Sequence, residues 1–317
     1  MNKYYFDLLN QMLEDMESAP EYYRPTPYWK QLIPTILKDV QEHGFENFRT
    51  TASFIELWGN VGHKLETEVH LAIFLTEDSK DKTPHLQQFS ESLIGHPTQT
   101  LKYNNCIYTN TSLNYLKGLS FLKKNVDTSL IQRVIEIGGG FGCLGEIFLK
   151  AKPGAYFYVD VDIPPIAAMA TYYLQTVFGK EAILDYIQSR NLQEIDIEQL
   201  SKKYRAIVLC PWQLPKLKGK FELGANFISF QEMEPNVVKN YLSYFDAHVS
   251  NYVLLRNSRY GKNVAKEPEQ MGVIQPIVRQ DYLDWLPSFN LIALDSKTFG
   301  HDTSMGFESE VMVLSKS

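Results

Sequence analysis

Residues 134–142 read Val-Ile-Glu-Ile-Gly-Gly-Gly-Phe-Gly, an apolar run that ends in a cluster of glycines. Leu144, Ile147 and Phe148 follow at helical spacing, which predicts a strand, a tight turn and a helix. Glycines at alternate positions let the backbone turn sharply, and they let a ligand approach main-chain amides that a side chain would cover. The stretch therefore predicts a site for a nucleotide-like ligand.

A second strand is predicted at residues 155–162, Ala-Tyr-Phe-Tyr-Val-Asp-Val-Asp, and it is closed by Ile163-Pro164-Pro165. Ligands of open parallel sheets lie outside the carboxyl ends of the strands. Asp162 is therefore expected to accept hydrogen bonds from ribose hydroxyl groups. Asp160 is the reserve candidate, because strand ends are uncertain by a residue or two. The alternative for Asp162 is an N-cap of the helix that begins near Pro164.

The spacing of the glycines fits two cofactors. Gly138, Gly140 and Gly142 form G-x-G-x-G, as in methyltransferases, whereas Gly140, Gly142 and Gly145 also satisfy the G-x-G-x-x-G of a dinucleotide site. Glu136, expected at the mouth of the turn, would repel a pyrophosphate but suits a sulfonium and an ammonium group. The sequence therefore favours S-adenosylmethionine, with S-adenosylhomocysteine as product, over NAD. The predicted cofactor-binding residues are Glu136, Gly138, Gly140, Phe141, Gly142, Asp160 and Asp162.

Four motifs together resemble the sugar O-methyltransferase family named for a nanchangmycin tailoring enzyme. They are the glycine stretch from Glu136, Val161-Asp162-Ile163-Pro164, Tyr172-Tyr173-Leu174 and Ser229-Phe230-Gln231-Glu232-Met233. The resemblance covers roughly residues 100–317, and it is weaker in the N-terminal third, where residues 45–49 carry most of the similarity. It implies a class I, Rossmann-like α/β sheet with an antiparallel C-terminal hairpin, preceded by a helical N-terminal domain. It also implies methylation of a sugar hydroxyl, including that of a glycosylated or nucleotide-linked sugar in natural-product biosynthesis.

Composition limits the partners. The 317 residues are 44% hydrophobic and carry a formal net charge of −6, and no basic run is present, which argues against nucleic-acid binding. No apolar stretch approaches the ~20 residues that span a bilayer, and residues 1–7 lack the apolar core of a signal peptide. We therefore expect a cytoplasmic protein that acts on a small-molecule acceptor, without nucleic-acid or membrane partners.

Two domains are expected, with a boundary near residue 125. Residues 1–125 show helical patterns interrupted by prolines and predict a lid, substrate-binding or dimerisation domain, so that a homo-oligomer is expected as one arrangement. Residues 126–317 form the predicted S-adenosylmethionine domain. A helix is predicted from Asn104 to Lys124. The long polar segment 258–280 is expected to cover the substrate.

Catalysis is assigned to the end of a strand predicted at residues 221–230. A sugar hydroxyl is a poor nucleophile that must lose its proton, and a nearby carboxylate or a divalent metal ion can assist. Glu232 is the predicted base or metal ligand, and Gln231 and Ser229 are predicted to orient the acceptor. The alternative is that Glu232 caps the following helix. No run of acidic residues resembles a complete metal site, so metal ligands are left unassigned.

Two other functions compete with sugar methylation. The glycine loop and Asp162-Ile163-Pro164 also resemble plant-type phenolic O-methyltransferases, which use a histidine base; His248 and His301 do not match that family's motif. A phenol O- or N-methyltransferase is therefore a weaker alternative. The third possibility is a catalytically silent S-adenosylmethionine-binding partner protein that works through its helical N-terminal domain.

Overall fold

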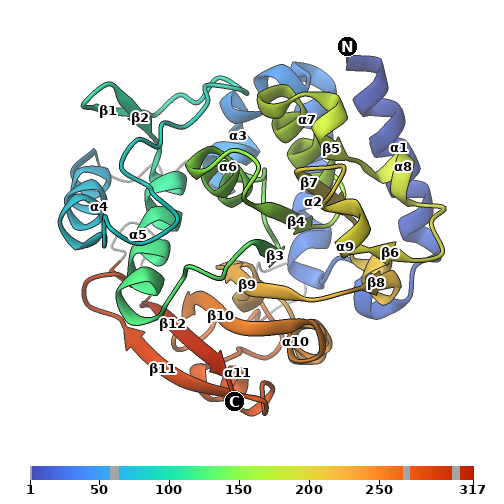
Figure 1. The fold of residues 1–317 in the computed structure, drawn as a ribbon. Helices are drawn as coiled ribbons and strands as arrows, with labels where there is room; N and C mark the ends of the chain where they lie inside the picture. The colour runs from blue at the N-terminus through green and yellow to red at the C-terminus, as the bar shows by residue number, and fades with distance from the viewer. Residues whose placement is uncertain (1, 58–63, 267–271, 302–307) are drawn as a thin grey trace.

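The computed structural model describes residues 2–57, 64–266, 272–301 and 308–317 (Figure 1). Within these residues, eight strands form one sheet in the order β11-β12-β10-β9-β3-β4-β7-β5. All neighbouring pairs are parallel except those of β12, which runs antiparallel to β10 and β11. The strands are β3 (Arg133–Ile137), β4 (Phe157–Val161), β5 (Ile183–Leu184), β7 (Ala206–Leu209), β9 (Phe221–Phe227), β10 (Val249–Ser258), β11 (Phe289–Asp295) and β12 (Ser309–Lys316).

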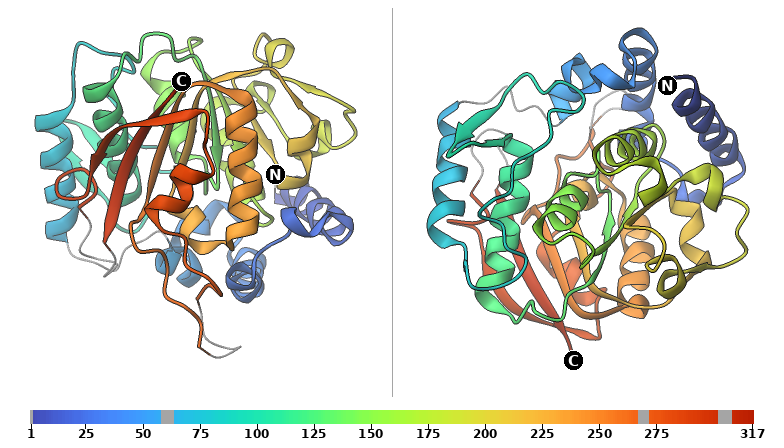
Figure 2. Two further views of the ribbon diagram at one scale, coloured as in Figure 1. Left: turned by 90° about the horizontal axis from the view of Figure 1, so that it is seen from below. Right: turned by 45° about the horizontal axis from the view of Figure 1, so that its top comes forward.

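Alternate residues of these strands enter two separate hydrophobic cores. Val134 and Leu254 belong to one core, whereas their neighbours Ile135 and Leu255 belong to the other. The first core is covered by α5 (Asn110–Asn125), α6 (Cys143–Ala151) and α7 (Ile166–Phe178), and the second by α10 (Pro235–His248) and α11 (Arg279–Asp284). In the left view of Figure 2, α5 and α10 lie on opposite sides of the C-terminal strands. The result is a three-layer α/β/α arrangement.

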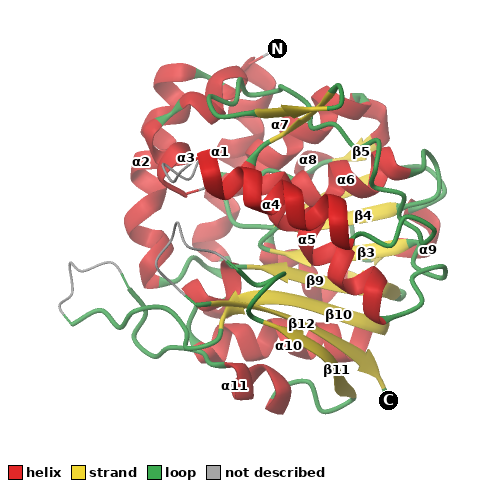
Figure 3. Cartoon of the chain, turned by 90° about the vertical axis from the view of Figure 1, so that its left-hand side faces the viewer, coloured by secondary structure: helices red, strands yellow, loops and turns green. Residues whose placement is uncertain are grey.

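The N-terminal third is helical and packs against the sheet domain (Figure 3). Its helices are α1 (Asn2–Ser18), α2 (Pro27–His43), α3 (Ala52–Leu57) and α4 (Lys64–Glu77), with 3-10 turns at Glu21–Tyr23 and Phe45–Thr50. Tyr5 of α1 meets Tyr172 of α7 edge-on at 5.1 Å between ring centroids. The first hydrophobic core is therefore continuous across the boundary predicted near residue 125, and the division into two domains stays a prediction.

These features confirm the predicted fold class, a Rossmann-like sheet with an antiparallel C-terminal pair and a helical N-terminal region. One local prediction is wrong. Residues 101–108 form a hairpin, β1 (Leu101–Tyr103) and β2 (Cys106–Tyr108), where a helix from Asn104 was expected. Asn104 and Asn105 both have positive φ, at 48° and 64°, as a two-residue hairpin turn requires. The helix begins only after Thr109, which caps it in a capping box with Ser112.

Between β5 and β9 the chain forms the short elements α8 (Tyr186–Ser189), β6 (Ile195–Asp196), α9 (Ile197–Leu200) and β8 (Leu217–Lys218), with a 3-10 turn at Pro211–Lys216. Two further 3-10 turns lie just before β5, at Lys180–Ala182, and just after β9, at Ser229–Glu232. Within the described residues, no helix has the length and apolar character needed to cross a membrane.

The strand order places a crevice between β3 and β9. From β3 the chain builds β4, β5 and β7 on one side, and it then crosses to build β9 and β10 on the other. Such a reversal leaves a gap outside the carboxyl ends of the two central strands, where ligands of open α/β sheets bind. Residues 138–142 follow β3 and residues 228–232 follow β9, so both predicted site segments lie at this crevice.

Candidate active site

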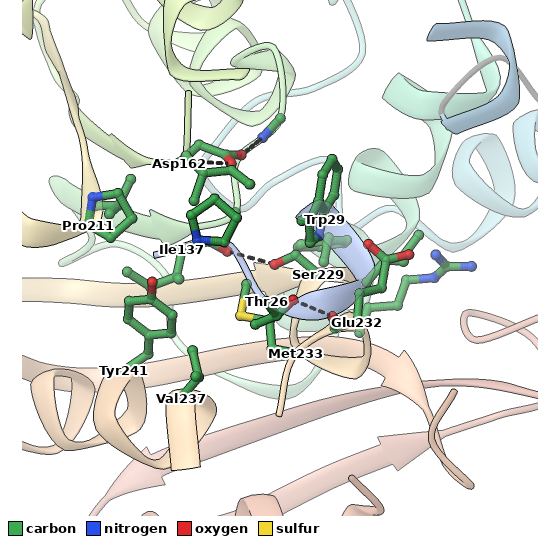
Figure 4. Close-up of a pocket in the computed structure, with 18 of the residues that line it drawn as sticks. Thr26, Trp29, Ile137, Asp162, Pro211, Ser229, Glu232, Met233, Val237 and Tyr241 are labelled. Carbon is green, nitrogen blue, oxygen red and sulfur yellow. Dashed lines mark hydrogen bonds between the residues drawn. The ribbon is translucent and has the colours of Figure 1, made fainter. Parts of the chain in front are cut away.

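A pocket that opens to solvent occupies the crevice, and its empty space, including the solvent at its mouth, is about 1180 Å³. Figure 4 shows Asp162 at its upper edge, Pro211 and Tyr241 on one side, and Trp29, Ser229 and Glu232 on the other. The Pro211 side is apolar, with Ile137, Ile163 and Val237 as further lining residues. An apolar slot beside a polar end is the usual composition of a small-molecule site.

The glycine loop needs glycine at Gly138 for two reasons. Its φ is +70°, in the left-handed region, and a Cβ there would lie 2.5 Å from Ser229 Cβ and closer still to Ser229 Oγ. The serine cannot easily move, because its Oγ accepts from Asn226 Nδ2 at 2.5 Å and donates to Ile137 O at 3.2 Å. Gly138 and Gly140 both line the pocket, so the loop backbone itself forms the wall.

Asp162 holds the same loop from the end of β4. Its Oδ2 accepts from the Gly140 amide at 2.9 Å, and its Oδ1 accepts from the Ile163 amide at 2.7 Å. The N-cap alternative is wrong, because α7 begins at Ile166 with Pro165 as its N-cap residue. Since a carboxylate has about four acceptor positions, two remain for hydroxyl groups of a ligand. Burial raises the pKa of Asp162, and the Glu232 carboxylate across the pocket adds to this effect.

Glu136 and Asp160 lie beneath the loop and do not line the pocket. Both are fully buried, and Tyr158 donates its hydroxyl hydrogen bond to Glu136 Oε2 at 2.6 Å. Burial raises the pKa of Glu136 to about 8, against the opposing effect of Tyr158, and it also raises that of Asp160. The expected position of Glu136 at the mouth of the turn is therefore wrong, and cofactor contact by Glu136 or Asp160 stays a prediction without support from the pocket.

Replacing Glu136 by glutamine is expected to flatten the dependence of stability on pH. Because the folded pKa lies above the unfolded value near 4.3, the folded protein keeps a proton that the unfolded chain has lost. The stabilisation is complete below about pH 4.3 and is lost as the pH rises towards 8. In urea titrations, the free energy of unfolding of wild type should decrease over this pH range, and that of Glu136→Gln should decrease less. The exposed Glu42 provides a control, since Glu42→Gln should follow wild type.

Phe141 and Gly142 serve packing rather than the pocket wall. The buried Phe141 ring lies 4.9 Å from the Tyr173 ring and 4.6 Å from the Arg49 guanidinium carbon. Gly142, with φ +90°, is the N-cap residue of α6, and a Cβ there would lie 2.9 Å from Leu174. The side chain of Phe141 thus points into the core, and neither residue belongs to the lining.

Glu232 joins three parts of the chain at the polar end of the pocket. Its Oε1 lies 2.8 Å from Lys262 Nζ, and its main-chain oxygen accepts from Thr26 Oγ1 at 3.2 Å. Lys262 Nζ also donates to the Tyr28 hydroxyl at 3.1 Å. In the described part of the chain, Oε2 of Glu232 has no hydrogen-bond partner and is therefore available to a ligand. The helix-cap alternative does not apply, because the N-cap residue of α10 is Glu234.

Gln231 is turned away from the pocket. It is buried, and its Oε1 accepts from the Ser258 amide at 2.5 Å, which ties the segment after β9 to the end of β10. Ile228, just before, has φ +73°, a strained conformation for a β-branched residue and one found at functional sites. A role of Gln231 in orienting the acceptor therefore stays a prediction that the geometry does not favour. Ser229 lines the pocket, but its hydroxyl is engaged with the loop.

Several lining residues were not predicted from the sequence as site residues. Arg24, Pro25, Thr26 and Trp29 contribute one wall, Asn110, Thr111, Asn114 and Tyr115 of α5 another, and Arg256 the end of β10. The N-terminal region therefore shapes the pocket directly. For α5, the capping cluster at Thr109 predicts where the helix begins but not what it faces. For Trp29, the aromatic cluster of Tyr22, Tyr23, Tyr28 and Trp29 allowed stacking on a sugar ring, but helix packing was the favoured interpretation.

Among the residues that the structure describes, the pocket contains neither a metal-binding cluster nor a histidine. In residues 2–57, 64–266, 272–301 and 308–317, no group of three or more His, Cys, Asp or Glu side chains is placed to hold a metal ion. None of the described lining residues is a histidine. His248 Nδ1 lies 3.0 Å from Gly219 O, before the start of β9 and thus at the opposite end of that strand from the crevice.

Comparison with solved structures finds methyltransferases. Magnesium protoporphyrin IX methyltransferase ChlM from Synechocystis PCC 6803 with bound SAH is 11% identical, with a TM-score of 0.41 over 65% of this chain and 84% of that one. The mitomycin 7-O-methyltransferase MmcR is 10% identical, with a TM-score of 0.41 over 92% and 67%. The N,N-8-amino-8-demethyl-D-riboflavin dimethyltransferase RosA from Streptomyces davawensis is 16% identical, with a TM-score of 0.38 over 63% of this chain and 53% of that one.

No protein-family model matches the chain, and no curated protein does. The chemistry therefore has to be judged from the residues of the pocket.

Proposed function

We propose that the chain transfers a methyl group from S-adenosylmethionine to a hydroxyl group of a small molecule, a sugar or a glycosylated or nucleotide-linked sugar. The observation that carries the proposal is the shared pocket of Gly138, Gly140 and Asp162 with Glu232 at its other end. When bound, S-adenosylmethionine supplies an electrophilic methyl group on a positively charged sulfur.

The residues present fit this cofactor better than a dinucleotide. The free acceptor positions of Asp162 suit ribose hydroxyl groups, and the slot between Ile163, Pro211 and Tyr241 suits an adenine ring. The carboxylates of Asp162 and Glu232 line the same pocket and act on each other electrostatically. Their negative charge attracts a cation and repels a pyrophosphate. The sequence assigned this role to Glu136, whereas Asp162 and Glu232 are the carboxylates that line the pocket.

Glu232 is the proposed proton acceptor. Lys262 pairs with Oε1 and holds the side chain in position, while Oε2 is available to a hydroxyl group. Oε2 would take up the proton of the acceptor hydroxyl group. Holding the acceptor in position beside the bound cofactor can contribute roughly 7–11 kcal/mol, so the walls formed by Trp29 and α5 matter as much as the base.

Incubation with S-adenosylmethionine and a panel of sugars, sugar nucleotides and phenols tests the proposal. Product is detected by mass as a gain of one methylene unit, together with release of S-adenosylhomocysteine. Methylated sugars are expected. Products formed from the phenols alone would contradict the sugar assignment, and cofactor binding without any product would favour the silent partner protein.

A further inference from the structure

The first two turns of α5 form a fixed wall of the pocket. Asn110, Thr111, Asn114 and Tyr115 share one helical face and all line the cavity. The Tyr115 ring lies 4.5 Å from the Phe227 ring of β9, and a Cβ on Gly118 would lie 2.5 Å from the same phenylalanine. Because α5 sits so close to the sheet, the position of its pocket-facing side chains is set by packing.

Asn114 is distinctive on this wall. It is only 8% exposed, its Oδ1 is shielded from solvent, and within the described residues its side chain makes no hydrogen bond. Buried amides normally have partners, and one left unpaired destabilises the folded protein. Asn226 of β9 is a buried amide with both ends hydrogen-bonded. Its Nδ2 donates to Ile137 O at 2.7 Å, and its Oδ1 accepts from Asn257 Nδ2 at 3.0 Å.

We propose that Asn114 recognises a hydroxyl group of the acceptor other than the one that is methylated. The inference rests on the proposed function and narrows its substrate class to polyhydroxylated acceptors. The amide presents its Nδ2 as a donor or, when flipped, its Oδ1 as an acceptor, and a hydroxyl group matches either orientation. Trp29, a buried lining residue from α2, adds an apolar aromatic surface to the same pocket. A flat phenol with one hydroxyl group would leave the amide of Asn114 unpaired.

The stability of the free protein gives the first test. Asn114→Leu removes an unpaired amide and is expected to keep or raise Tm. Asn226→Leu removes a fully paired amide and is expected to lower Tm by about 3 °C or more. A decrease for Asn114→Leu as large as that for Asn226→Leu would show an internal structural role and overturn the inference.

Kinetics with the best sugar of the panel give the second test. With wild type, one deoxy analogue that retains the methylated hydroxyl should lose about tenfold or more in kcat/KM, and Asn114→Leu should lose a similar factor on the parent sugar. On that analogue the variant should lose little further, because the two changes remove the same interaction. The affinity for S-adenosylhomocysteine should be unchanged.

The outcomes separate this inference from the proposed function. If wild type methylates the sugar and Asn114→Leu does so equally well, the inference is overturned and the function stands. Equal losses for the variant on every deoxy analogue also overturn it. If wild type binds S-adenosylhomocysteine but methylates no sugar, the sugar assignment fails and the inference fails with it.

Discussion

A Gly138→Ala variant is expected to lose at least about 30-fold in affinity for S-adenosylhomocysteine while remaining folded. The added Cβ meets Ser229, whose hydroxyl is held by Asn226 and Ile137, and the left-handed backbone at φ +70° adds strain. Crowding of this kind typically costs about 1–3 kcal/mol and the left-handed conformation about another 1–2, and a loop displaced to relieve these costs no longer presents its amides to the ligand. Calorimetric titration measures the loss.

Two companion variants isolate the cause. Gly154 has a similar φ of +79° but open space around it, so Gly154→Ala reproduces the strain without the collision and should bind the ligand normally. Gly138→Ala combined with Ser229→Gly removes the collision and should recover part of the affinity. Wild-type affinity in Gly138→Ala would show that the loop does not approach the ligand.

A Glu232→Gln variant is expected to reduce turnover by about 100-fold or more, because a proton acceptor contributes typically 10²–10⁴. Glutamine keeps the size of the side chain and its position beside Thr26 but cannot take up a proton. Affinity for S-adenosylhomocysteine should change little. A loss below about tenfold, with the fold intact by circular dichroism, would rule out Glu232 as the base.

Lys262 gives this assignment a second readout. In Lys262→Met the ion pair that holds Glu232 Oε1 is lost, so the carboxylate should be less well positioned and kcat should decrease, while affinity for S-adenosylhomocysteine should change little. Lys262→Arg keeps the charge and should restore most of the wild-type kcat. An unchanged kcat in Lys262→Met would mean that the ion pair does not act on the catalytic group.

The central fold was predictable because its signals are local. The apolar run at residues 134–137, the glycine cluster and the proline after Asp162 lie together in the chain, and α7 ends where Gly179 follows Phe178. The β1–β2 hairpin was missed although Tyr103-Asn104-Asn105-Cys106 carries a turn signal, since asparagine tolerates positive φ. The strand predicted to reach Phe230 ends at Phe227, because Ile228 has a positive φ that is incompatible with a strand. The Ile228 amide donates to Arg256 O of β10 at 2.7 Å, a tertiary contact that the local sequence does not reveal.

The candidate site was only partly predictable. Asp162 and Gly138 follow from motif and strand order, whereas the burial of Glu136 depends on Tyr158 of the neighbouring strand. Lys262 lies thirty residues after Glu232, and only the fold brings them together. Asn114 has no motif at all. Residues that depend on a tertiary contact therefore escape a pattern-based prediction, even when the segment that carries them is correctly identified.

The most direct test of the methyltransferase proposal is calorimetric titration with S-adenosylhomocysteine, with NAD as the control ligand. Wild type should bind S-adenosylhomocysteine and not NAD, and Asp162→Ala should lose about 10- to 100-fold, as expected for hydrogen bonds to a charged group. The exposed Asp127 supplies the matched control, and Asp127→Ala should bind normally. Binding of NAD in preference to S-adenosylhomocysteine, or of neither, would contradict the proposal.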